Sequence, residues 1–326
     1  MRFRMSIGMV VAALIGGVIG QMGGAEAASH PSGIRGLGEA RASLTDRAWS
    51  GRVFDVAQGR WLSVEERRQR LQGLEVLVLG EKHDTPIVQL EQARALAEAW
   101  EANRDEKKQW ILGWEFLNRR DQRVIDGHWS NYRRGLTSDA EFMDRLLGQG
   151  RNRSYLPILQ VGVQIGAELR GVNLSREEKA PVVRGGISAL DPALLPPGFA
   201  LGGVGYRERF EAVMTGGHAS PEQVGRYFEA QSLTDAVMAD ALMQGAAAFR
   251  VLVTGSFHSD YFDGVFARLL AQSSGVHRLL SIRFVDASDY PKSELEPELR
   301  LAEPVHHSTY GALADWIWFA GEPSEN

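Results

Sequence analysis

Acidic and imidazole side chains recur at the ends of short apolar segments that lie far apart in the chain. They are Glu81, His83, Glu115 and His258. Two imidazoles and two carboxylates form a ligand set that suits iron, zinc or manganese, and two histidines with one carboxylate are a common iron site. The same groups can also transfer protons without a metal. Either chemistry requires the fold to bring the four residues together.

The segments that carry these residues are predicted to be β-strands. Five such segments are visible, at 74–79, 109–116, 167–173, 250–254 and 279–285. Helix-like stretches separate them, which is typical of an α/β fold with a mainly parallel central sheet flanked by helices. Ligands of such sheets bind beyond the carboxyl ends of the strands. Glu81 and His83 are two residues apart, so an extended backbone points both side chains the same way.

Further polar residues are predicted to support this site. Asn173 ends the third strand, and Gln231 and Asp235 share one face of a long predicted helix whose other members are apolar. Burying such groups unpaired costs a few kcal/mol. We expect them either to hydrogen-bond the ligands of the site or to hold a loop. Gly80 and Gly255 are expected to let the chain turn sharply where two strands finish.

A simpler alternative leaves no site at all. In it, Glu81 pairs with Lys82 at the surface, and each histidine is an isolated loop residue. Four strand ends that each carry an acid or an imidazole favour the shared site over this alternative.

The first residues, 1–27, are predicted to be a signal peptide. Arg2 and Arg4 precede an apolar run that ends in small residues, the three-part pattern of secretion. The run is shorter than the roughly twenty residues of a membrane span. We therefore expect cleavage and a periplasmic or secreted protein that does not span the membrane.

The remaining organisation is that of one main domain. We expect a flexible lead-in at 28–50, an α/β domain at 51–290 with helical insertions at about 121–165 and 181–248 that form a cap, and a C-terminal extension at 291–326.

Three local features of the structure can be predicted from the sequence. Ser175 and Glu178 form a capping-box pattern at a helix start. A second helix is predicted from Pro221 to Ala248. Alternating aromatics at 312–319 are expected to pack as an edge strand or a core plug.

The composition excludes several classes of protein. The net charge of -5 and the pI near 6.0 argue against a nucleic-acid partner, which requires a basic face. The chain has no cysteine, so disulfides, thiolate nucleophiles and cysteine-bound metals are excluded, as is a lipoprotein anchor.

Five blocks of sequence, in order, resemble the ChaN-like haem-binding family. They are LVLGEKHD, GWEF, NLSRE, FEAQSLTDAVMA and VLVTGSFH, and the likeness as a whole covers roughly residues 55 to 285. The family belongs to a larger group with Tiki-type metalloproteases and erythromycin-esterase-like proteins. The resemblance implies haem binding in an exported protein and a part in iron acquisition. In the metalloprotease branch, Gly-x-x-His motifs hold a metal, and Gly80–His83 and Gly255–His258 fit that pattern.

The chain also departs from the family pattern. Many members are lipoproteins, and several carry further histidines where this chain has Val88 and Gln89. If those histidines contact haem, their absence here favours a metal ion over haem as the ligand of this chain.

Two functional hypotheses follow, from different classes. The first is an exported haem or iron carrier that uses His83 and His258, with pairing of two subunits around the cofactor. The second is a metal-dependent hydrolase, in which Glu81 activates a metal-bound water and His83, Glu115 and His258 hold the ion. A third alternative is an interaction scaffold that has lost its ligand.

Overall fold

The computed structural model describes residues 49–106, 108–214, 219–246, 248–273, 278–291, 295 and 305–324. The predicted signal peptide and nearly all of the predicted lead-in lie outside these residues. No helix of the described residues is long and apolar enough to cross a membrane.

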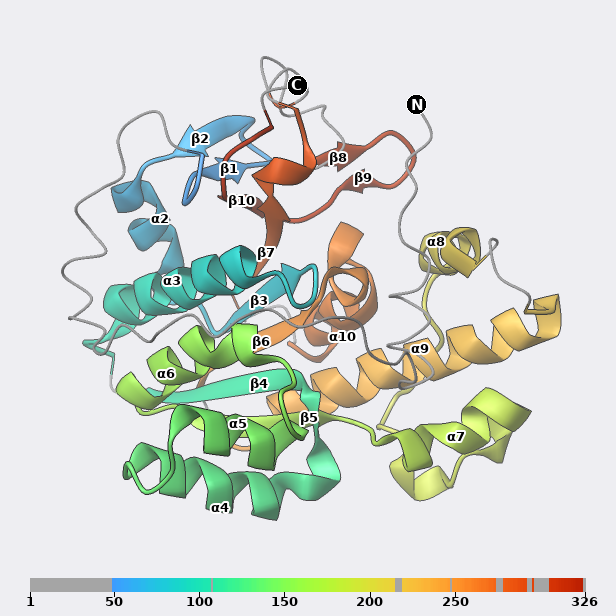
Figure 1. Ribbon diagram of the computed structural model, residues 1–326. Coiled ribbons are helices and arrows are strands. Elements are labelled where there is room, and N and C mark those ends of the chain that lie inside the picture. Colours follow the sequence, from blue (N-terminus) through green and yellow to red (C-terminus); the bar gives the residue numbers. More distant parts are fainter. Residues whose placement is uncertain are drawn as a thin grey trace.

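An eight-stranded sheet forms the centre of the molecule, in the order β2-β1-β10-β7-β3-β6-β4-β5 (Figure 1). The strands are β1 (Val53–Asp55), β2 (Arg60–Leu62), β3 (Val76–Glu81), β4 (Gln109–Asn118), β5 (Glu168–Asn173), β6 (Ala248–Gly255), β7 (Leu279–Asp286) and β10 (Trp316–Ala320). From β10 to β5 every neighbouring pair is parallel, and only β1 and β2 add antiparallel pairing. The predicted α/β fold with a mainly parallel sheet is confirmed.

All five strands expected from the sequence are present, as β3 to β7. For the tail, an edge strand or a core plug was expected. The edge position is wrong, because β10 lies between β1 and β7, and β10 is buried along its whole length. Two further short strands, β8 (His306–His307) and β9 (Gly311–Ala312), form a separate hairpin.

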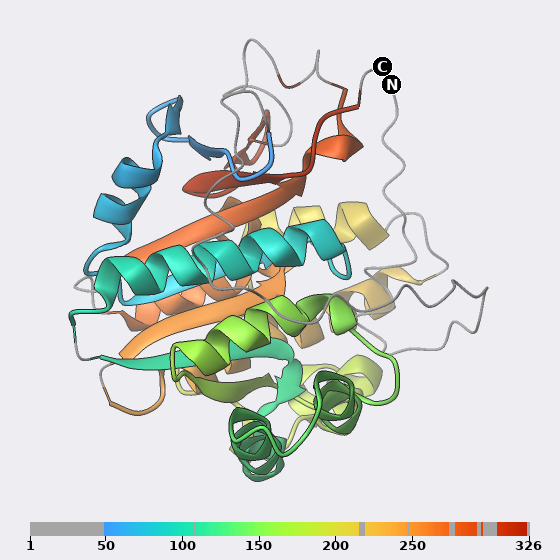
Figure 2. The same ribbon diagram turned by 60° about the vertical axis from the view of Figure 1, so that its left-hand side comes forward.

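Helices cover both faces of the sheet (Figures 1 and 2). They are α2 (Val64–Leu71), α3 (Pro86–Asn103), α4 (Gln122–Arg133), α5 (Asp139–Leu147), α6 (Leu156–Gln164), α7 (Arg176–Gly185), α8 (Val204–Met214), α9 (Pro221–Met243) and α10 (Gly264–Gln272). Side chains of β3 alternate between the two faces, as a pleated strand requires. Leu77 and Leu79 pack in the cluster with α3 and α6, whereas Val76 and Val78 pack with α9 and α10.

Two helix predictions can be compared directly with the structure. The capping box at Ser175 and Glu178 is present at the start of α7. The helix predicted up to Ala248 ends instead at Met243, because Gln244 is extended and Ala248 already begins β6.

Candidate functional site

Three neighbouring strands, β3, β6 and β4, deliver the predicted residues to one rim of the sheet. Glu81 is the last residue of β3, and Glu115 lies near the end of β4. His258 closes the 3-10 turn Ser256–His258 that directly follows β6. The structure therefore places all four predicted residues at the carboxyl ends of parallel strands, where ligands of such sheets bind.

His83 lies between the two carboxylates. Its Nδ1 is 3.0 Å from Glu81 Oε1 and its Nε2 is 2.9 Å from Glu115 Oε1. Glu81 is buried, and Lys82 points away to Asp289, 3.0 Å distant. The alternative in which Glu81 pairs with Lys82 at the surface is wrong.

The pKa values of both carboxyl groups and of the imidazole are shifted. Burial disfavours the charged ring, but Glu115 and then Glu81 outweigh it and raise the pKa of His83 to about 10. Burial likewise opposes the charge of Glu115, yet His83 and His258 hold the pKa of this carboxyl well below its usual range. Burial is the dominant cause for Glu81 and raises its pKa. The protonated ring of His83 is thus the cation that balances this pair of acids.

Glu115 is also held in place by β6, the strand next to its own. Its Oε2 accepts hydrogen bonds from the Thr254 hydroxyl at 2.5 Å and from the Gly255 backbone N–H at 2.7 Å. The carboxylate can therefore present Oε1 to His83 without rotating.

Glycines at this rim provide space. The ring of His83 reaches from β3 to Glu115 on β4, and so it must cross the end of β6, which lies between them. A Cβ on Gly255 would lie 2.6 Å from His83 Nε2, and one on Gly80 would lie 2.3 Å from Ser259 Oγ. A 3-10 turn follows Gly255, as predicted, whereas Gly80 lies within β3; neither glycine has a positive φ, so neither backbone conformation requires glycine. Both positions need glycine because a side chain passes over them.

His258 is held by α9, which packs on the face of the sheet opposite to α3 and α6. Its Nδ1 lies 2.6 Å from Asp235 Oδ1 and 3.0 Å from the Gln231 side-chain amide, and Tyr206 donates to the other oxygen of Asp235 at 2.8 Å. Burial lowers the pKa of His258, but Asp235 outweighs it, so the pKa is raised. The other nitrogen, Nε2, is 3.5 Å from the Gln231 side-chain nitrogen and 3.9 Å from Glu115 Oε2.

Residues 68–269 match the family model described as haem-binding uptake, Tiki superfamily, ChaN. The chain belongs to this family. The resemblance inferred from the five sequence blocks is thereby confirmed.

The fold of this ChaN-family chain is also found in a solved structure. The structure of ChaN of Campylobacter jejuni, described by its cofacial haem binding, is 17% identical with a TM-score of 0.62 and covers 83% of this chain and 96% of that one. Weaker likenesses are the type III effector HopBA1 (TM-score 0.45, 12% identity, 86% and 100% covered) and a mutant of the erythromycin esterase EreC in its open conformation (0.40, 12%, 84% and 83%). No curated protein matches the chain.

The predicted supporting residues of the ChaN-family site separate into two kinds. Gln231 and Asp235 contact His258 directly. Asn173 instead donates to the backbone carbonyl of Glu115 at 2.8 Å, so it fixes the strand end and not the carboxylate.

Two residues that sequence reasoning did not select also bind Glu81. The Tyr155 hydroxyl and the Gln89 side-chain amide each donate to its carboxylate, and Tyr155 also lies 3.3 Å from His83 Nδ1. Gln89 was noted from the sequence only as a departure from the pattern that the resemblance implies. Tyr155 had no comparable mark, because its contact depends on how α6 packs on α3.

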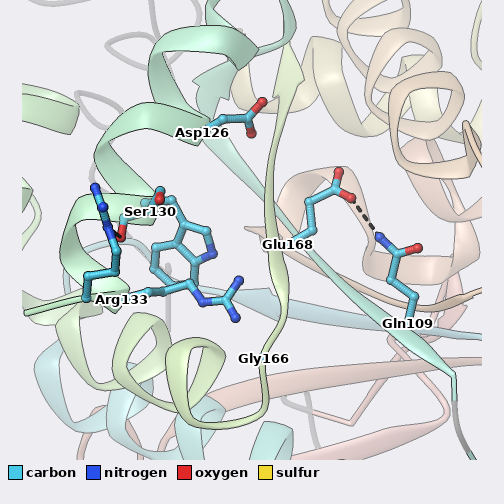
Figure 3. A pocket seen from close by; sticks show the side chains of 8 residues that line it. Gln109, Asp126, Ser130, Arg133, Gly166 and Glu168 are labelled. Atoms are coloured by element: carbon cyan, nitrogen blue, oxygen red, sulfur yellow. Dashed lines mark hydrogen bonds between the residues drawn. The ribbon is translucent and has the colours of Figure 1, made fainter.

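Metal-site geometry is not preformed at the rim. In the part of the chain that the structure describes, no group of three or more His, Asp or Glu side chains is arranged to hold a metal ion. A hollow of about 490 Å³ lies elsewhere: Gln109 and Glu168 line it at the amino ends of β4 and β5 (Figure 3). It is thus separate from the rim that carries the histidines.

Proposed function

We propose that this protein binds haem at the rim formed by β3, β6 and β4, with His258 as the principal iron ligand. One observation carries the proposal. Asp235 holds Nδ1 of His258 at 2.6 Å, whereas Nε2 of the same ring has only long contacts among the described residues, 3.5 Å to the Gln231 side-chain nitrogen and 3.9 Å to Glu115 Oε2. An imidazole whose second nitrogen is fixed by a carboxylate is the arrangement that proteins use for metal-binding histidines.

The side chains at this rim fit a haem group in their chemistry. Histidine is a common axial ligand, and the polarity and hydrogen bonding around it tune the iron. The ring of His83 packs at 5.1 Å on Phe116, so an aromatic surface adjoins the polar cluster. His83 itself can bind iron only after losing its proton and its bond to Glu115. We therefore assign it the lesser part in holding the cofactor. When bound, haem would supply the iron that the proposed carrier transports.

Titration with haemin tests the proposal. Purified protein without residues 1–27 should give a saturable Soret shift, and His258→Ala should alter the position of the band and weaken binding by about tenfold or more. His83→Ala should weaken binding less. His128→Ala, in α4 away from the rim, is the matched control. Absence of a saturable shift, or an identical shift in His258→Ala, would refute haem binding at this rim.

We also propose that the protein is exported and takes part in haem or iron uptake. The support is the signal-peptide pattern of residues 1–27 and the uptake role in the description of the family. Full-length protein produced in a Gram-negative host should appear in the periplasmic fraction with a mass that lacks those residues. An unprocessed protein in the cytoplasm would contradict export.

We also propose that two subunits pair around the cofactor. Its support is the cofacial haem binding described for ChaN of Campylobacter jejuni. Sedimentation with and without one equivalent of haemin should show a monomer converted to a dimer. A monomer that persists when the Soret band is saturated would exclude this assembly.

A metal-dependent hydrolase is the second candidate, and one observation favours it. Two carboxylates and an imidazole already lie together at the rim, because His83 is within 3.0 Å of both Glu81 and Glu115. In this candidate Glu81 activates water, and His83, Glu115 and His258 hold iron, zinc or manganese. Elemental analysis of protein purified without chelators should then show about one transition metal per chain. Metal-free protein that binds haemin would exclude it.

A further inference from the structure

The loop that carries His258 has a backbone conformation that its own residues do not favour. It joins β6 to α10 and begins with the 3-10 turn Ser256–His258. Tyr261 and Phe262, a few residues later, both lie in the left-handed region, with φ of 64° and 59°. Residues with bulky side chains rarely adopt this region, and they keep it only where the surrounding structure imposes it. Contacts from outside the loop must therefore hold it.

The guanidinium of Arg209, on α8, binds this loop on both sides of His258. Arg209 is buried, and its Nη2 donates to the backbone carbonyl of Asp260 at 3.1 Å. The guanidinium carbon lies 4.4 Å from the ring centre of Tyr261 and 4.9 Å from that of Phe257. A cation over an aromatic ring is attracted to it, most strongly where water is excluded. Phe257 precedes His258 directly and Tyr261 follows it by three residues, so one side chain bridges the loop.

The same helix also holds the imidazole. Tyr206 lies three residues before Arg209, on the same face of α8. Its hydroxyl donates to Asp235, the residue that holds Nδ1 of His258. The end of the loop packs just as closely, because a Cβ on Gly264 would lie 2.4 Å from the His258 carbonyl oxygen. The backbone and the ring of His258 are therefore both supported from α8.

Arg209 is placed to support the loop and not to contact a ligand. It is 7% exposed, and its charge is balanced within the loop by Asp263, 3.5 Å away. The loop is anchored from its other side by the C-terminal extension, where the Leu313 carbonyl accepts from the Tyr261 N–H at 2.8 Å. The guanidinium is thus an internal clamp on the segment that presents His258.

We propose that Arg209 is the positioning residue that holds His258 in the orientation in which it binds its ligand. The inference rests on the proposed haem function, deepens it by naming the support of the iron ligand, and gives Arg209 no contact with the haem. Without the guanidinium, we expect Tyr261 to leave the left-handed region and Nε2 of His258 to lose its fixed direction. A group that is ordered before binding costs less free energy to bind than one that must be ordered by the ligand.

A double-mutant cycle with haemin separates this role from a general loss of structure. Arg209→Met keeps an extended apolar side chain and removes the charge and the donors. In otherwise wild-type protein it should weaken haemin binding about fivefold and move the Soret band toward that of His258→Ala. In the His258→Ala background the same substitution should change the affinity by less than about twofold.

Two further variants serve as controls. Arg209→Lys keeps a cation over the rings and should restore part of the affinity and of the band position. Arg67→Met is the matched control, because Arg67 is also buried and also lies over an aromatic ring, that of Trp318 at 5.0 Å. It pairs with Glu98 in the second half of α3, away from the rim, and its substitution should leave haemin affinity and the Soret band unchanged.

Hydrogen exchange of the ligand-free protein tests the clamp without haem. The Ser259 N–H donates to the Ser256 carbonyl at 3.0 Å, and the Tyr261 N–H donates to that of Leu313. In Arg209→Met these two amides should exchange about tenfold faster, whereas the amides of β6, which report opening of the whole fold, should change less.

The outcomes separate this inference from the proposed function. Unchanged exchange at Ser259 and Tyr261 overturns the inference, and so does an equal loss of haemin affinity on Arg209→Met in both backgrounds; haem binding by wild-type protein stands in either case. If wild-type protein binds no haemin, the proposed function fails, and faster exchange in Arg209→Met still supports Arg209 as the residue that positions the loop.

Discussion

Replacing Glu115 by Gln tests the charge balance of the rim in the ligand-free protein. This carboxylate, 2.9 Å from His83 Nε2, is the main attraction that outweighs burial and raises the pKa of His83 from 6.5 to about 10. At ~1.4 kcal/mol per tenfold change, that difference corresponds to about 5 kcal/mol in favour of the charged ring. With only Glu81 left, we expect the variant to lower the pKa of His83 by about 1–3.

The consequence for stability has a definite sign. A pKa that is higher in the folded than in the unfolded chain stabilises the fold fully below the unfolded value, and this is lost as the pH rises through the folded value. Wild-type protein should therefore lose stability between about pH 6.5 and 10 because of His83. In Glu115→Gln the loss should be smaller and should be complete at lower pH. The variant should also be less stable at pH 6 by about 3–5 kcal/mol, since a buried ion pair is broken.

Urea unfolding, followed through the eight tryptophans at a series of pH values, measures this dependence. Proton NMR of the imidazole gives the pKa of His83 directly. Glu91→Gln is the matched control, because Glu91 is also buried but binds Arg94 and Trp318. The control should lose stability and keep the alkaline slope. An unchanged slope in Glu115→Gln would refute the assignment of the alkaline loss to this ion pair.

The other predictions concern the side chains around the two imidazoles. Gly255→Ala would place a Cβ 2.6 Å from His83 Nε2, so we expect a displaced ring, a lower pKa of His83 by NMR and a stability loss of about 1–3 kcal/mol in urea. Gly127→Ala, where nothing lies within 4 Å, should not destabilise; equal effects would contradict the crossing of His83 over β6. Asp235→Asn removes the main attraction on His258 and should lower its pKa in an NMR titration, and an unchanged value would exclude Asp235 as the cause.

Four of the five strands that were predicted correctly share one property. β3, β4, β6 and β7 are apolar runs buried on both faces, and such runs are visible in a sequence without any knowledge of partners. β1 and β2 have three residues each, too few to show a period. The place of β10 was not predictable in the same way, because the order of strands in a sheet is set by packing and not by order in the chain.

The contacts of the site could be predicted only in part. Glu81, Glu115 and His258 were selected because each lies at the end of a strand, and parallel strands end at one rim. Contacts that depend on how helices pack have no such pattern in the sequence. Tyr155 and Gln89, which both bind Glu81, project from elements whose position follows only from the folded core.

Gly255 shows how strand order changes the meaning of a residue. A glycine at the end of a strand predicts a turn that requires glycine. Gly255 has a φ of -59°, which any residue can adopt, so the turn that follows it does not require glycine. What requires glycine is that β6 lies between β3 and β4, so that the ring of His83 must pass over β6 to reach Glu115. The Gly255 N–H, on the same strand, donates to Glu115 Oε2 at 2.7 Å. The absence of a side chain at this position thus makes room for the ion pair, and the backbone of the same residue orients the carboxylate that forms it.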